Sequence, residues 1–133
     1  MTTLRVDVWS DIACPWCYVG KRHLEQALAR FPSREGVEVL WRAFELDPSV
    51  PAKLPAEIPY SERLAKKYGC SREEAERMIR RMTATAAQDG LDFRFDRIRP
   101  GNTFDAHREL HLAQDRGKQD AVKERFFRAY LSE

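Results

Sequence analysis

Two cysteines three positions apart, Cys14 and Cys17 in the stretch ACPWC, are the residues of this sequence whose type and spacing best suit chemistry. Such a pair can hold a metal ion, form an inert cross-link, or exchange electrons as a disulfide bond forms and breaks. A cross-link over one helical turn closes almost no loop and adds little stability. Metal binding and redox exchange are therefore the two interpretations to compare.

A metal site would need more ligands than this pair supplies. Zinc usually takes four, commonly as two cysteine pairs or as one pair with two histidines. The other candidates are Cys70, His23, and the pair His107 and His111, whose spacing puts two imidazoles on one helix face. With no second cysteine pair in the sequence, we expect redox exchange, with neither metal nor organic cofactor. A metal-binding or redox-sensing module using Cys and His is the alternative.

The expected local structure assigns a role to each cysteine. A strand over residues 4–10 and a helix from Pro15 place Cys14 at the helix N-cap. Its sulfur then lies against the free N–H groups of the first turn, which lower a cysteine pKa to roughly 3.5–7.5. Cys14 is predicted to be the nucleophile. Cys17, one turn on and on the apolar side, is predicted to be the shielded resolving thiol, with Trp16 at the rim of the site.

The first third of the chain reads as strand, helix, strand. The strand over 4–10 is followed by a helix over 15–31 and a second strand over 37–44, which favours a parallel pair with a right-handed crossover. Prolines at positions 48, 51, 55 and 59 then predict an irregular link.

Most of the remaining chain is predicted to be helical. Helices are expected over 61–68, over 72–89 behind a Ser71/Glu74 capping box, from Asn102 or Thr103 to 115, and from 119 onward. The last helix carries the apolar residues Val122, Phe126 and Tyr130. Residues 91–98 alternate like a strand, but between two helices an extended connector is the alternative.

Composition limits the partners. The 133 residues carry 23 basic and 21 acidic side chains, a net charge of +2, with both signs interspersed. This balance predicts neither a nucleic-acid nor a membrane partner. The start of the chain shows no basic and then apolar targeting pattern, and the cysteine count is odd, so we expect a cytoplasmic protein.

Four stretches together carry a family resemblance: DIACPWCYVGKRHLEQAL, VEVLWRAFELDP, GNTFDAH and FFRAYLSE. On these the sequence resembles the DsbA-family thioredoxin-fold thiol-disulfide oxidoreductases, and most closely the FrnE-like branch. The resemblance implies an α/β fold with a thioredoxin-like βαβ unit in residues 1–47, a proline-rich link in 48–60, and an inserted helical domain in 61–133. The C-terminal strands of the fold are absent from this chain.

The resemblance also implies an activity. Members oxidise, reduce or isomerise protein disulfides, which makes Cys14 and Cys17 the redox centre, protein or peptide disulfides the substrates, and a small-molecule or protein thiol the reductant. Asn102, Thr103 and His107 match a recurring stretch of the family and are expected to face the active-site side. Related glutathione-dependent isomerases and transferases have serine at the first motif position, so Cys14 argues against that activity.

One family feature is missing. Members carry a cis-proline opposite the cysteine pair on the segment that returns to the sheet, whereas Pro100 here precedes a helix. Two parallel strands are also few for a stable sheet. We therefore expect the chain to be the N-terminal part of a protein of roughly 200–250 residues, with completion of the sheet by a second copy, as a homodimer, as the alternative.

Overall fold

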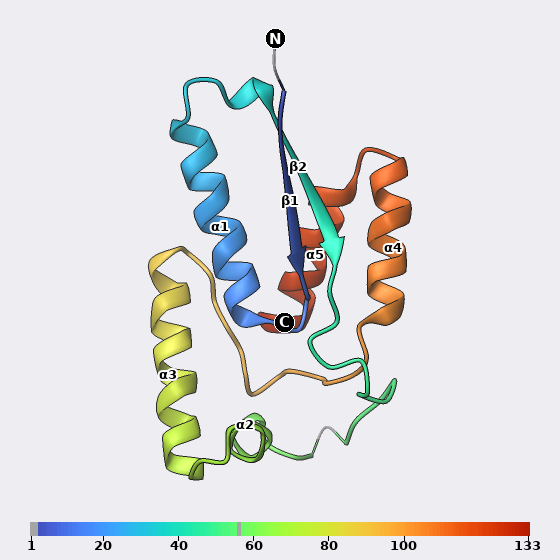
Figure 1. Cartoon of the computed structure of the whole chain (residues 1–133). Coiled ribbons are helices and arrows are strands. Elements are labelled where there is room, and N and C mark those ends of the chain that lie inside the picture. The colour runs from blue at the N-terminus through green and yellow to red at the C-terminus, as the bar shows by residue number, and fades with distance from the viewer. Residues whose placement is uncertain (1–2, 56) are drawn as a thin grey trace.

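The computed structural model describes residues 3–55 and 57–133, and it shows the mixed α/β fold that the sequence predicts. The elements are β1 (Leu4–Ser10), α1 (Pro15–Arg30), a short 3-10 turn η1 (Arg34–Gly36), β2 (Val37–Ala43), α2 (Tyr60–Tyr68), α3 (Arg72–Gln88), α4 (Phe104–Asp115) and α5 (Gln119–Leu131). In Figure 1 the two strands stand at the centre, with α1 on one side, α4 on the other, α5 behind β2, and α2 and α3 at one end. The predicted segments 1–47, 48–60 and 61–133 stay a prediction, and residues 1, 2 and 56 within them lie outside the described part.

β1 and β2 form a parallel sheet whose register runs from Leu4 opposite Val37 to Ser10 opposite Ala43. Because side chains alternate along a strand, Val8 and Trp41 share one face while Trp9 points to the other. Trp41 is only 4% exposed and Trp9 is 63% exposed. The Trp41 face is the one that α1 and α5 cover, through lysines of both helices that lie over its ring.

The core joins α1 to α5 and to the segment before α4. Tyr18 of α1 stacks on Phe127 of α5, with ring centroids 4.8 Å apart and planes 6° apart. The predicted strand over 91–98 does not form, and the connector alternative is correct. Residues 91–98 still place Phe93 and Phe95 in the core, because this segment lies over the core. It has no partner strand among the described residues, and a hydrogen bond of 2.7 Å from the Arg94 N–H to the Leu131 carbonyl holds it to the end of α5.

The apolar residues predicted on the last helix pack against the core, but the most buried positions lie one residue further along. Phe127 and Leu131 of α5 are fully buried, whereas Val122, Phe126 and Tyr130 are half-buried at the edge of the core. The reason is that α5 packs against both α1 and β2, so its buried side includes positions that look polar in the sequence. Lys123, with no exposed surface, is one of them.

The proline-rich segment is irregular, as predicted, but it is tied to the residues before α4. The Leu54 N–H donates to the Pro100 carbonyl at 3.4 Å, and the Asn102 N–H donates to the Pro51 carbonyl at 3.1 Å. Gly101 sits where a Cβ atom would come within 2.6 Å of the Ala52 carbonyl oxygen. This close backbone approach requires glycine and brings the start of α4 toward the end of β1.

Candidate active site

Cys14 occupies the N-cap of α1, where the sequence predicts it. Its backbone is extended (φ −98°, ψ 111°), Pro15 is the first helical residue, and the Cys14 Sγ accepts the Cys17 backbone N–H at 3.3 Å. An N-cap side chain normally satisfies one of the free N–H groups of the first turn, and here a sulfur does so. The same N–H groups stabilise negative charge on that sulfur.

Both cysteines are free and half-buried. The neighbouring Cys14 thiol lowers the pKa of Cys17 to about 6, and the same interaction raises the pKa of Cys14. The protonated Cys17 that the sequence predicts stays a prediction, because the charge of such a pair belongs to both sulfurs. Because the two sulfurs share one proton, moving it to Cys17 places the thiolate on Cys14, where the Trp16 and Cys17 N–H groups stabilise it. The pair therefore offers a thiolate at either position.

A buried carboxylate lies three residues before Cys14. Asp11 is 3% exposed, and it accepts the Leu46 backbone N–H at 2.9 Å. The Nε2 atom of His107 lies 3.3 Å from its other oxygen. Burial raises the pKa of Asp11, but the nearby His107 and Thr103 side chains and the bond from the Leu46 N–H outweigh this and lower it. Asp11 is therefore held as a carboxylate next to the cysteine loop.

The three residues of the GNTFDAH stretch separate in the structure. His107, on α4 and 4% exposed, and Thr103, the N-cap of α4, both contact Asp11. Asn102 instead donates to the Val50 carbonyl at 2.9 Å and accepts the Phe104 N–H at 2.8 Å. Asn102 thus holds the proline-rich segment and the start of α4, while Thr103 and His107 lie behind the loop that carries Cys14.

Lys123 is a further residue at this site that the sequence did not indicate. Its Nζ atom lies 5.7 Å from the centre of the Trp41 ring and 5.0 Å from that of Phe127. It has no hydrogen-bond partner among the described residues. Burial lowers the pKa of Lys123 to about 8, although the nearby charge of Cys17 acts in the opposite direction. The only sequence signal was a lysine one turn before Phe127, inside an otherwise apolar stripe.

Trp16 is 49% exposed, so it presents apolar surface at the rim of the site, as expected from its place between the cysteines. A cavity of about 530 Å³ opens beside Asp11 and Ala13. Its apolar walls include Leu46, Leu54 and Leu64, and its remaining lining includes Tyr60, Tyr130 and the cations Arg63, Lys66 and Lys67 of α2. This cavity borders the loop that carries Cys14.

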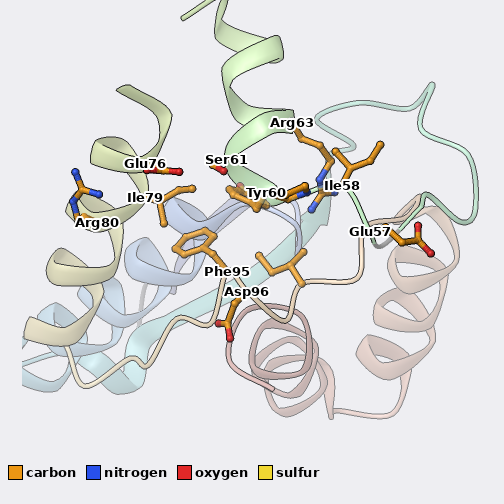
Figure 2. Close-up of a pocket in the computed structure, with 12 residues that line it drawn as sticks. Glu57, Ile58, Tyr60, Ser61, Arg63, Glu76, Ile79, Arg80, Phe95 and Asp96 are labelled. Atoms are coloured by element: carbon orange, nitrogen blue, oxygen red, sulfur yellow. The ribbon is translucent and has the colours of Figure 1, made fainter. Parts of the chain in front are cut away.

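A second pocket, of about 510 Å³, lies between α2, α3 and the segment before α4, and no residue of the Asp11–Cys17 loop lines it. Figure 2 shows Tyr60 and Phe95 facing each other there, with ring centroids 4.9 Å apart. Tyr60 and Arg63 line both cavities. Burial raises the pKa of Tyr60 to about 12, so this hydroxyl stays protonated at neutral pH.

The described residues contain no cluster of three or more His, Cys, Asp or Glu side chains arranged to hold a metal. No helix in residues 3–55 or 57–133 is long and apolar enough to cross a membrane. Cys70 lies in the turn between α2 and α3, half-buried, and His111 is exposed on α4.

Comparison with known proteins agrees with this geometry. A solved structure described as a probable DsbA oxidoreductase from Streptomyces coelicolor superposes with a TM-score of 0.86 and is 46% identical over 98% of this chain and 55% of its own. The uncharacterised protein YwbO of Bacillus subtilis is 29% identical over 98% of this chain and 58% of its own length. The chain thus spans slightly more than half the length of these relatives. The profile of the DSBA-like thioredoxin domain matches residues 5–133, and the chain belongs to that family.

Proposed function

We propose that the protein is a thiol-disulfide oxidoreductase in which Cys14 attacks the substrate disulfide and Cys17 resolves the product. The observation that carries this proposal is the Cys14 sulfur at the N-cap of α1, where it accepts the Cys17 backbone N–H at 3.3 Å. A thiolate so placed is stabilised without a metal or an added base. Family membership supports oxidoreductase activity in general.

The reaction is two successive thiol-disulfide exchanges. The Cys14 thiolate attacks one sulfur of the substrate, which forms a mixed disulfide and releases the other sulfur as a thiolate. The Cys17 thiolate then attacks the Cys14 sulfur, which forms the Cys14–Cys17 disulfide and frees the second substrate thiolate. The pair gives two electrons and the substrate accepts them; the reverse sequence oxidises a dithiol.

The cavity beside Asp11 and Ala13 suits a peptide segment next to the reacting disulfide. Its leucine and tyrosine walls match an apolar side chain, and the α2 cations Arg63, Lys66 and Lys67 match an acidic one. We therefore propose protein or peptide disulfides as substrates and a small-molecule or protein thiol as the electron partner. We also propose that the protein belongs to the FrnE-like branch of the family and that it acts in the cytoplasm.

Cysteine variants test the two roles directly. Cys14→Ser should abolish turnover of a disulfide-bonded peptide, since no mixed disulfide can form. Cys17→Ser should accumulate the mixed disulfide on Cys14, detected as an added peptide mass that a reductant removes. Cys70→Ser is the matched control and should turn over normally. Full turnover in Cys14→Ser would overturn the proposal.

A further inference from the structure

Lys123 is a buried cation for which the fold alone gives no reason. Its side chain has no exposed surface, and its ammonium group meets aromatic rings but no hydrogen-bond acceptor in the described residues. Removing an ammonium from water without a partner is strongly unfavourable, so such a group persists where another gain offsets the cost. Aromatic faces offset part of it. The part of this free-energy cost that the rings do not offset suggests that Lys123 has a role at the nearby cysteines.

Two kinds of group surround Lys123. The rings of Trp41 from β2 and Phe127 from α5 lie against its ammonium, and the charged or titratable groups that act on it most are Cys17, Asp11, Cys14 and Lys21. Among these charges, that of Cys17 acts on Lys123 most strongly. Asp11 accepts the Leu46 N–H, and its lowered pKa keeps it a carboxylate whether the cysteines are reduced or oxidised. Cys17 is therefore the neighbour whose charge changes during a redox cycle.

We propose that Lys123 is a positioning residue of the redox centre, whose buried ammonium is the counter-ion of the thiolate that Cys17 must become to resolve the mixed disulfide. The inference rests on the proposed function. In the mixed disulfide, Cys14 is bonded to the substrate and no longer shares a proton with Cys17. Lys123 then supplies the remaining positive charge beside Cys17.

The resolving step balances without any further reactant. Cys17 releases its proton to solvent, and its thiolate attacks the Cys14 sulfur. The Cys14–Cys17 bond forms as the bond from Cys14 to the substrate breaks, and the departing substrate thiolate takes up a proton from solvent. Lys123 stays charged throughout and exchanges no electrons. Once the disulfide has formed, the ammonium has lost its thiolate, so the same residue favours the reduced pair and makes the disulfide a stronger oxidant.

The test compares two lysines of similar burial. Lys123→Met and Lys21→Met both exchange a buried lysine beside Trp41 for an unbranched apolar side chain. Lys21 lies one turn along α1 from Cys17, but its charge is paired with Glu25, Glu124 and Asp120, whereas Lys123 has no hydrogen-bond partner in the described residues. The reduced protein is mixed with oxidised glutathione, quenched in acid at intervals, and the mixed disulfide is counted by mass. At pH 7 its lifetime should lengthen about tenfold in Lys123→Met, the effect of one pKa unit on the thiolate fraction. In Lys21→Met it should stay within about twofold of wild type.

The pH profile separates this role from a structural one. In Lys123→Met the resolution rate should keep rising with pH to at least the ordinary thiol pKa of about 8.5, whereas in wild type it should level off below that value. A poorly folded variant would slow the reaction without moving the profile. An unchanged lifetime and profile in Lys123→Met would overturn the inference.

Two further results keep the test decisive. If Lys123→Met does not fold, the wild-type profile alone decides, and a rate that still rises past about pH 8.5 contradicts the inference. If Cys14→Ser also formed the mixed disulfide, the proposed function itself would fail. An inactive Cys14→Ser together with normal resolution in Lys123→Met would remove only the role of Lys123.

Discussion

Two buried lysines lie over the same tryptophan ring, but they differ in their charged partners and in the direction of their pKa shift. Lys21 of α1 and Lys123 of α5 have their Nζ atoms 6.0 and 5.7 Å from the centre of the Trp41 ring. Lys21 contacts three carboxylates: Glu25 one turn on, Glu124 at 2.9 Å and Asp120 at 3.4 Å. Its hydrogen bonds outweigh the effect of burial and raise its pKa, whereas burial lowers that of Lys123.

The difference shows which region is built for stability and which for chemistry. Around Lys21, Arg22 also binds Glu25 and Glu124, and the Tyr18 hydroxyl donates to Glu124 at 3.0 Å. Every charge there has a partner, so the cluster joins α1 to α5. Around Lys123 no carboxylate of the described residues forms an ion pair, and of the two charges that act on it most, that of Asp11 is constant while that of Cys17 exists only when the cysteine pair is reduced and ionised. An uncompensated buried charge next to reactive groups is typical of functional sites.

The largest expected effect is on the free energy of unfolding, which the two methionine variants should change in different directions. Lys21→Met leaves three carboxylates without their cation and should lower the free energy of unfolding by about 1–2 kcal/mol. Lys123→Met replaces an unpaired buried charge by an apolar chain and should leave it unchanged or raise it by about 1–3 kcal/mol. Urea unfolding of both reduced variants at pH 7 measures this. Equal losses in the two variants would remove the distinction.

The second prediction concerns pH. The pKa of Lys123 is about 8 in the folded chain against 10.5 for an ordinary lysine. Between these values the unfolded chain binds more protons, so the contribution of Lys123 to stability rises with pH. The free energy of unfolding of Lys123→Met relative to that of wild type should therefore fall by roughly 2–3 kcal/mol from pH 8 to 10.5, at about 1.4 kcal/mol per pKa unit.

The measurement for this prediction is the difference in urea midpoint between wild type and Lys123→Met at each pH. Taking the difference cancels the titration of residues whose pKa is the same in both proteins. A difference that stays constant from pH 8 to 10.5 would mean that the Lys123 ammonium carries no burial cost.

A smaller effect is expected at the centre of the Lys21 cluster. Glu124→Gln keeps an oxygen for the Tyr18 hydroxyl but removes the charge that Lys21 and Arg22 share. The loss of unfolding free energy should be about 1–2 kcal/mol, since Glu25 and Asp120 still serve Lys21. Calorimetry at pH 7 checks it. In the Lys21→Met background the same change should cost clearly less, because the two residues are in contact.

The smallest effect is that of salt. Glu25 and Asp120 have side chains 37% and 71% exposed, so solvent ions reach their side of the Lys21 cluster. Raising sodium chloride to about 0.5 M should lower wild-type stability by less than about 1 kcal/mol, and by still less in Lys21→Met. Lys123 has no exposed surface, so Lys123→Met should respond to salt as wild type does.

Local sequence signals predicted much of this architecture. The N-cap position of Cys14, the Ser71/Glu74 capping box and the glycine ends of α2 and α3 depend on neighbours within a few residues, and the structure shows each of them. Such signals are short-range, so the pattern of the sequence contains them in full.

Lys123 and Asp11 were not found from the sequence, for a common reason. Lysine and aspartate are rarely fully buried, so a composition-based reading assigns both to the surface. What buries them is tertiary packing: Lys123 meets Trp41, and Asp11 meets Leu46 and His107, across long separations in the chain. The same packing buries Phe127 of α5 more deeply than Phe126.

The central claim is that Cys14 and Cys17 form a reversible dithiol-disulfide pair, and a redox titration tests it most directly. The protein is equilibrated in glutathione buffers of graded reduction potential, and free thiols are alkylated. The mass of the peptide containing both cysteines is then measured by mass spectrometry. The account predicts one two-electron transition in which both thiols disappear together while Cys70 remains free. A pair that stays fully reduced in oxidising buffer, or a disulfide that includes Cys70, would contradict it.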